Sequence, residues 1–65
     1  MTIEVVMHRT SSGILTACVR QEGQLGSNLL AGRSFTKVES AQEALKGILW
    51  WKFRGELWIQ WTIKA

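Results

Sequence analysis

Apolar and polar residues alternate along the first part of the chain. Apolar residues occupy every second position between Thr2 and His8, and several of them are β-branched. A period of two predicts a β-strand. Thr10-Ser11-Ser12-Gly13 then predicts a hairpin turn, and a second strand is expected over residues 14–21. In this register one sheet face carries the apolar residues of both strands: Ile3, Val5, Met7, Leu15, Ala17 and Val19.

The next segment has a weaker strand pattern. Glu22-Gly23 is typical of a second tight turn, and leucines recur over residues 24–31. Gly26, however, interrupts this apolar pattern, and glycine inside a strand indicates a bulge or an irregular stretch. We therefore expect a third strand over residues 24–31 that is not regular throughout.

An amphipathic helix is expected in the second half of the chain. Ser40 followed by Glu43 matches a capping box, which predicts that the helix begins at Ser40. The helix would run to about Lys52, and Gly55 is placed to end it. A helical wheel then assigns one stripe to the sheet, with Leu49 at its edge: Ala41, Ala44, Leu45, Ile48 and Trp51.

Alternation returns over residues 57–63, which predicts a last strand. Its core side would carry Leu57, Ile59, Trp61 and Ile63, and its outer side would carry Trp58. The order β-β-β-α-β predicts one α+β domain over residues 1–65. We expect a two-layer sandwich of a mostly antiparallel sheet with one helix on one face. The pattern leaves open whether the last strand pairs with the first or the third.

One helix leaves the other sheet face uncovered. In the expected register that face carries four apolar residues: Val6, Ile14, Cys18 and Trp58. A contiguous exposed apolar patch is typical of an interaction site. The simplest interpretation is a homodimer that forms through the open sheet face.

The helix carries a second candidate surface. Trp50 lies opposite the predicted buried stripe, with Lys46 one turn before it and Arg54 one turn after it. Such a ridge could anchor a protein partner, together with the outward-facing Trp58. It could also stack on a nucleobase while its cations meet phosphates. A third possibility is an internal cation–π contact.

Composition narrows the chemistry. The net charge of +3 favours acidic partners without requiring nucleic acid. The chain has one cysteine, one histidine and no aspartate, which excludes an internal disulfide, a closed zinc site built by one chain and a Ser-His-Asp triad. His8 and Cys18 form the one candidate catalytic pair, without an evident cleft. We expect no enzyme, cofactor, metal or small-molecule substrate.

Localisation follows from two absences in the sequence. A secretory signal pattern is missing, as is an apolar stretch of membrane-spanning length. The free cysteine is compatible with a reducing compartment. We therefore expect a cytoplasmic protein that binds no membrane.

A short family likeness adds little to this picture. The segment from Ser40 to Leu45 resembles the helix start of small HicB-type antitoxin domains. The likeness covers a generic capping box and implies no residue roles. The sequence therefore predicts a non-catalytic protein-interaction module of the inhibitor or adaptor type, which self-associates. A nucleic-acid-binding protein is the alternative.

Overall fold

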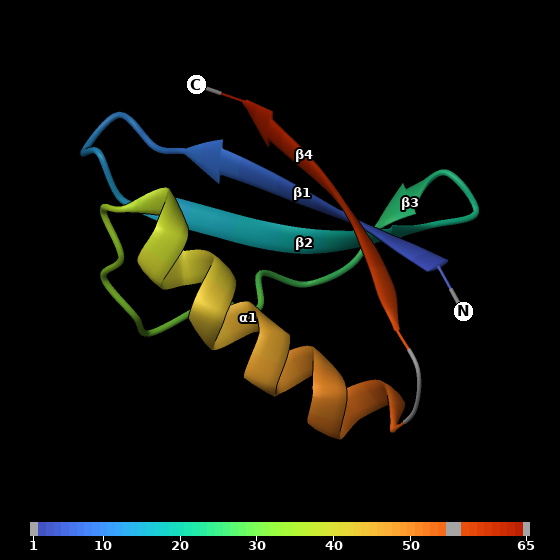
Figure 1. Cartoon of the computed structure of the whole chain (residues 1–65). Coiled ribbons are helices and arrows are strands. Elements are labelled where there is room, and N and C mark those ends of the chain that lie inside the picture. Colours follow the sequence, from blue (N-terminus) through green and yellow to red (C-terminus); the bar gives the residue numbers. More distant parts are fainter. Residues whose placement is uncertain (1, 55–56, 65) are drawn as a thin grey trace.

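The computed structural model of the chain describes residues 2–54 and 57–64. They form one helix and an open four-stranded sheet, as Figure 1 shows. The elements in chain order are β1 (Thr2–Arg9), β2 (Leu15–Gln21), β3 (Gln24–Leu25), α1 (Val38–Phe53) and β4 (Trp58–Lys64). The prediction of an α+β domain in the order β-β-β-α-β is confirmed.

The β1–β2 hairpin forms as the alternating pattern predicts. The strands are antiparallel with Val5 opposite Val19 and Met7 opposite Ala17, so their apolar residues share one face. The Gly13 amide donates to the Thr10 carbonyl oxygen at 2.9 Å. Gly13 has a φ of 86°, a conformation that glycine adopts without steric cost. The guanidinium of Arg9 donates to the carbonyl oxygens of Gly13 and Thr36, and so ties the hairpin turn to the loop before the helix.

The third strand is much shorter than predicted. β3 contains only Gln24 and Leu25, which pair antiparallel with the end of β2. The chain then follows β2 through isolated backbone hydrogen bonds without a regular ladder, and the Asn28 side chain supplies a further acceptor. Its Oδ1 atom accepts from the amides of Ala17 and Leu30 at 2.9 and 3.0 Å. Gly26, which interrupts the strand pattern in the sequence, thus directly follows the last residue of the regular strand.

β4 pairs with β1, which settles the pairing that the sequence left open. The two strands are parallel, with Ile3 opposite Ile59 and Val5 opposite Trp61. The sheet order is therefore β3-β2-β1-β4, with β1 between β2 and β4. The helix lies in the connection from β3 to β4. This connection crosses the sheet and brings β4 to the free side of β1 in the same direction as β1. The sheet is mostly antiparallel, with one parallel pair.

The helix begins earlier than the capping-box prediction, which is wrong. Lys37 is the N-cap, and no side chain caps the first turn. Ser40 lies inside the first turn, and Glu43 lies 3.5 Å from the Lys46 ammonium group instead of reaching back to the helix start. Val38 packs against the core from the first helical position. Packing of the Val38 side chain against the core favours a helix that begins at Val38, because this packing outweighs the capping that Ser40 would provide.

The buried stripe of the helix also differs from the prediction. Ala41, Leu45 and Leu49 are fully buried, whereas the predicted core residue Trp51 is 67% exposed. The helix is rolled toward Val38 and Phe53, which pack against the core from its two ends. Leu49, expected at the edge of the stripe, therefore lies at its centre.

The C-terminal end of the helix is formed by Arg54. This residue adopts a left-handed conformation with a φ of 43°, and its amide donates to the Trp50 carbonyl oxygen at 3.0 Å. That hydrogen bond satisfies one of the last carbonyl groups of the helix. Gly55, which was predicted to end the helix, lies outside the described residues.

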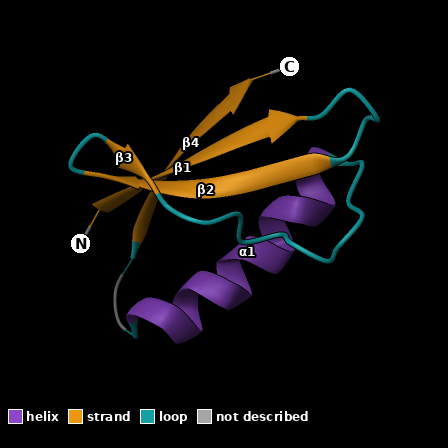
Figure 2. Ribbon diagram, turned by 180° about the vertical axis from the view of Figure 1, so that it is seen from behind, coloured by secondary structure: helices purple, strands orange, loops and turns teal. Residues whose placement is uncertain are grey.

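Figure 2 shows the helix lying over one face of the sheet, and the buried core residues come from these two layers and from the segment after β3. Leu30 enters the core from that segment. Leu57, Ile59 and Trp61 pack against its margin as predicted, but Ile63 is 47% exposed. The single helix therefore leaves part of the edge strand β4 uncovered on the helix side. In the described part of the chain, no helix has the length and apolar character needed to cross a membrane.

Candidate protein interface

Three of the four tryptophans have most of their side chain in solvent. Trp50 is 59% exposed, Trp51 is 67% exposed and Trp58 is 71% exposed. Indole rings bury large areas when they are covered, and tryptophan is common where proteins bind one another. A domain this small has few ways to offset so much exposed aromatic surface. These residues are therefore the first candidates for a binding site.

Two of these tryptophans form a pair on the outer side of α1. The ring centroids of Trp50 and Trp51 are 5.5 Å apart, and the planes meet at 86° in an edge-to-face arrangement. On the helical wheel Gly47 falls between Trp50 and Trp51, on the same outer side of α1. A Cβ atom added at Gly47 would meet nothing within 4 Å. The helix surface at Gly47, beside the two indoles, is therefore open. We call Trp50, Trp51 and Gly47 the tryptophan patch.

Basic residues surround this patch only in part. Lys46 is exposed but lies 3.5 Å from the carboxylate of Glu43. Arg54 is exposed at the end of the helix. The predicted ridge of Lys46, Trp50 and Arg54 thus lies on the outer side of α1 and its C-cap. Trp50 contacts Trp51, and the described residues contain no cation–π contact, so the alternative of an internal cation–π cluster does not hold.

Trp58 belongs to a different surface. It opens β4 and lies opposite Thr2 of β1, on the sheet face that points away from the helix. The four residues predicted to bind one partner are therefore divided. Lys46, Trp50 and Arg54 lie on the helix side of the molecule, and Trp58 lies on the open sheet face.

The apolar patch expected on the open sheet face does not form as predicted. Val6 lies beside Cys18 in the register, but only 6% of Val6 is exposed. Ile14 precedes β2 at the hairpin turn, whereas Trp58 pairs with Thr2 at the other end of β1. The four predicted interface residues are thus spread along the sheet, and the central one is covered.

Polar side chains lie next to Val6 on the open face. Glu4 accepts a hydrogen bond from the Thr62 hydroxyl at 2.8 Å, and its other carboxylate oxygen lies 3.9 Å from the Arg20 guanidinium. These residues lie on three adjacent strands, next to Val6 in the register. The centre of the open face is therefore polar. An antiparallel sheet can leave such a face in water without a partner.

His8 and Cys18 do lie near each other on this face, as the sequence predicts. Val6 is opposite Cys18 and His8 is opposite Thr16, so the histidine and the cysteine are diagonal neighbours across the hairpin. Glu4 could orient a base but is already held by Thr62 and Arg20. Within residues 2–54 and 57–64, His, Cys, Asp and Glu form no cluster that could hold a metal ion.

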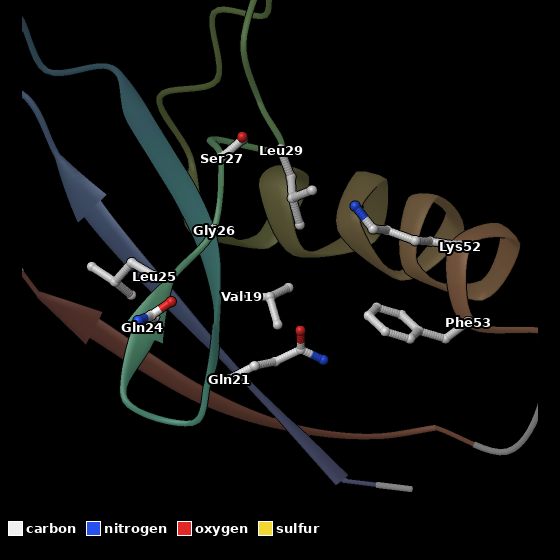
Figure 3. Close-up of a pocket in the computed structure, with 9 residues that line it drawn as sticks. All are labelled: Val19, Gln21, Gln24, Leu25, Gly26, Ser27, Leu29, Lys52 and Phe53. Carbon is white, nitrogen blue, oxygen red and sulfur yellow. The ribbon is translucent and has the colours of Figure 1, made fainter.

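A shallow pocket of about 250 Å³ lies between the β2–β3 edge and the C-terminal end of α1. Figure 3 shows Val19 and Phe53 pointing toward each other, with Lys52 reaching over them from the helix. Gln21 and Gln24 contribute amides at the strand side. Lys52 and Ser27 are the lining residues with groups for acid–base or nucleophilic chemistry, and no histidine or carboxylate lines the pocket to activate the Ser27 hydroxyl, so this pocket suits binding better than catalysis.

Sequence reasoning missed Trp51 as a candidate site residue. A helical wheel centred on Ala41, Leu45 and Leu49 places Trp51 outside the buried side.

Comparison with protein-family models, with curated proteins and with solved structures gave no match to this chain. The function of the chain is therefore inferred from the geometry and chemistry of its own surfaces.

Proposed function

We propose that this protein is a non-catalytic protein-interaction module of the small inhibitor or adaptor type, which binds its partner through the tryptophan patch. One observation carries the proposal. Trp50 and Trp51 are both exposed and in contact on the outer side of a helix whose inner side is fully packed. The patch is therefore surplus to folding, and covering it with a partner removes a large apolar area from water.

The helix geometry also describes the partner. An apolar side chain can pack on the open helix surface at Gly47, beside the two indoles. Lys46 and Arg54 at the rim favour acidic groups around that apolar anchor. The expected partner is thus a protein surface with an apolar projection and an acidic border.

Nucleic acid is the alternative partner, and two observations place it second. Glu43 lies beside Lys46 and offsets its charge. The two indole planes are nearly perpendicular, whereas successive stacked bases need aromatic platforms that are roughly parallel. The free Cys18 supports a reducing, cytoplasmic location for either function.

The direct test is affinity capture from an extract of the source cells, followed by identification of the retained proteins. The wild type is compared with Trp50→Ala/Trp51→Ala and with Leu25→Ala, which removes an exposed apolar side chain from β3. We expect a protein that the wild type and Leu25→Ala retain and the double variant loses. Equal retention by all three proteins would remove the patch from the proposal.

A fluorescence titration with a mixed-sequence single-stranded oligonucleotide decides the alternative. It is made at about 50 and 200 mM salt, because phosphate contacts weaken steeply over that range. The protein-binding proposal predicts no saturable quenching at low salt. Saturable, salt-sensitive quenching that is lost in Trp50→Ala would replace it with nucleic-acid binding.

A further inference from the structure

The two edges of the sheet differ in how far their backbone groups have hydrogen-bond partners. On the β2 side, β3 and the segment after it supply backbone partners. Gly26 donates to the Val19 carbonyl oxygen at 2.9 Å, and Leu29 donates to the Ala17 carbonyl oxygen at 2.7 Å. Near the hairpin, Leu15 donates to the Phe35 carbonyl oxygen at 2.8 Å. This edge is closed along most of β2.

The β4 edge has no such cover. β4 pairs with β1 over all seven of its residues, and none of the strands in the described ranges pairs with its outer side. Natural edge strands are commonly protected by proline, a bulge or inward charges. The β4 register runs without a bulge, the chain contains no proline, and Lys64 at the last position is the one charged residue of the strand. β4 is thus a regular, unprotected edge.

Large apolar side chains lie beside this edge on both faces. Ile59, Trp61 and Ile63 are only partly covered on the helix side, and Ile63 is 47% exposed. Trp58 is 71% exposed on the open side. A second strand added here would bury apolar surface on each face and also satisfy free backbone groups.

The sequence of β4 is complementary to itself in one antiparallel register. A two-fold axis at Trp61 pairs the full length of both strands and keeps each residue on its own face. Ile59 then meets Ile63 of the second copy, and the two Trp61 residues meet each other on the helix side. On the open side Gln60 meets Thr62, and Lys64 meets Trp58. No like charges are opposed, and each lysine lies against an indole, which is a favourable cation–π arrangement.

We propose that two copies of this chain associate through antiparallel pairing of their β4 strands, centred on Trp61, to form one continuous sheet. Both helices then lie on the same face of that sheet, because the two-fold axis is perpendicular to it. The sequence predicted self-association through the open sheet face, whereas this pairing uses the β4 edge; it goes beyond the proposed function and uses none of Trp50, Trp51 and Gly47. One strand pair buries a modest area, so the dimer is expected at micromolar concentrations and above.

Sedimentation velocity from micromolar to millimolar protein tests the proposal. The wild type should convert from monomer to dimer, and Ile63→Lys should raise the midpoint of that conversion about tenfold or more, because it places a cation beside Ile59 of the second copy. Leu25→Lys is the matched control. It places the same charge at the other edge of the sheet, on a residue whose exposure is similar to that of Ile63. Leu25 pairs with Arg20, and its side chain lies on the open face. This control should dimerise like the wild type.

The register is tested by disulfide formation in a Cys18→Ser background. Gln60→Cys and Thr62→Cys proteins are mixed in equal amounts under mild oxidation, and the mixed dimer should exceed each self-cross-linked product by clearly more than the roughly twofold excess that random pairing gives. A monomeric wild type at every concentration overturns the proposal. So does dimerisation that Leu25→Lys abolishes and Ile63→Lys preserves, since that result assigns the contact to the open face or the β3 edge.

The two proposals fail separately. A monomeric protein that still loses its partner in the Trp50→Ala/Trp51→Ala variant refutes the β4 dimer alone. A dimer whose captured proteins do not depend on those tryptophans refutes the tryptophan patch alone.

Discussion

Both sides of α1 carry apolar side chains, but only one of the two sides packs against the sheet. The inner side is formed by Ala41, Leu45 and Leu49, which are fully buried. The outer side carries Trp50 and Trp51, which are largely exposed. Burial of the small inner side chains stabilises the fold, whereas the larger outer ones contribute little to it. Apolar content alone therefore does not identify the packed side of a helix.

The largest effect is expected from Leu49→Ala. Leu49 is fully buried against the sheet, so truncation leaves a cavity and should lower the free energy of unfolding by about 2–5 kcal/mol. Urea denaturation followed by far-UV circular dichroism measures the loss. Leu25→Ala is the control and should change stability little, because Leu25 is 55% exposed. Equal losses in the two variants would contradict the assignment of the inner side.

Trp61→Ala should have an intermediate effect. Sequence reasoning treats Trp61 as a core residue, but the structure leaves it half-buried at the margin of the core on the edge strand. We therefore expect a loss of about 1–3 kcal/mol in a urea titration at concentrations where the protein is monomeric. A loss as large as that of Leu49→Ala would show that the helix covers β4 more fully than described.

Gly47→Ala should stabilise the protein. The position is helical, and an added Cβ meets nothing within 4 Å, so alanine should raise the free energy of unfolding by up to about 1 kcal/mol. The same methyl group occupies part of the open helix surface beside the indoles and should weaken partner capture. A variant that is more stable and binds equally well would separate Gly47 from the tryptophan patch.

The smallest change in stability is expected from Trp50→Ala. The ring contacts Trp51 and is 59% exposed, so its loss should alter the free energy of unfolding by no more than about 0.5 kcal/mol. Thermal melting of the wild type and the variant side by side measures this. A drop comparable with that of Trp61→Ala would mean that the outer side of the helix is part of the core.

Local patterns predicted the hairpin well because its strands alternate cleanly and its turn needs a glycine with positive φ. The face of the helix was harder to predict, since Ala44, Ile48 and Trp51 form an apolar stripe beside the one that packs. Only contact with the sheet chooses between the stripes, and Val38 and Phe53 at the helix ends decide the roll. The pairing of β4 with β1 likewise depends on how the connection through α1 crosses the sheet, and the residues of β4 do not specify it.

The candidate site shows the same limit. Exposure of Trp50 and Lys46 followed from the wheel, whereas Trp51 was assigned to the core. On the open face, alternation places Val6 outward, but it does not show that Val6 is buried or that Glu4, Thr62 and Arg20 interact beside it. Polar side chains that bond across three strands become visible only once the register is known.

The central position of β1 has a consequence for the order of folding. Its contacts with β2 are local and can form early, but Thr2 meets Trp58 only after the intervening segment is ordered. Closing the loop between Thr2 and Trp58 costs conformational entropy and is therefore slow. Pairing of β4 with β1 should be a late step in folding. Until then β1 is itself an open edge, and chains at high concentration can aggregate along it. Pulse-labelled hydrogen exchange should therefore show the hairpin amides protected before those of β4.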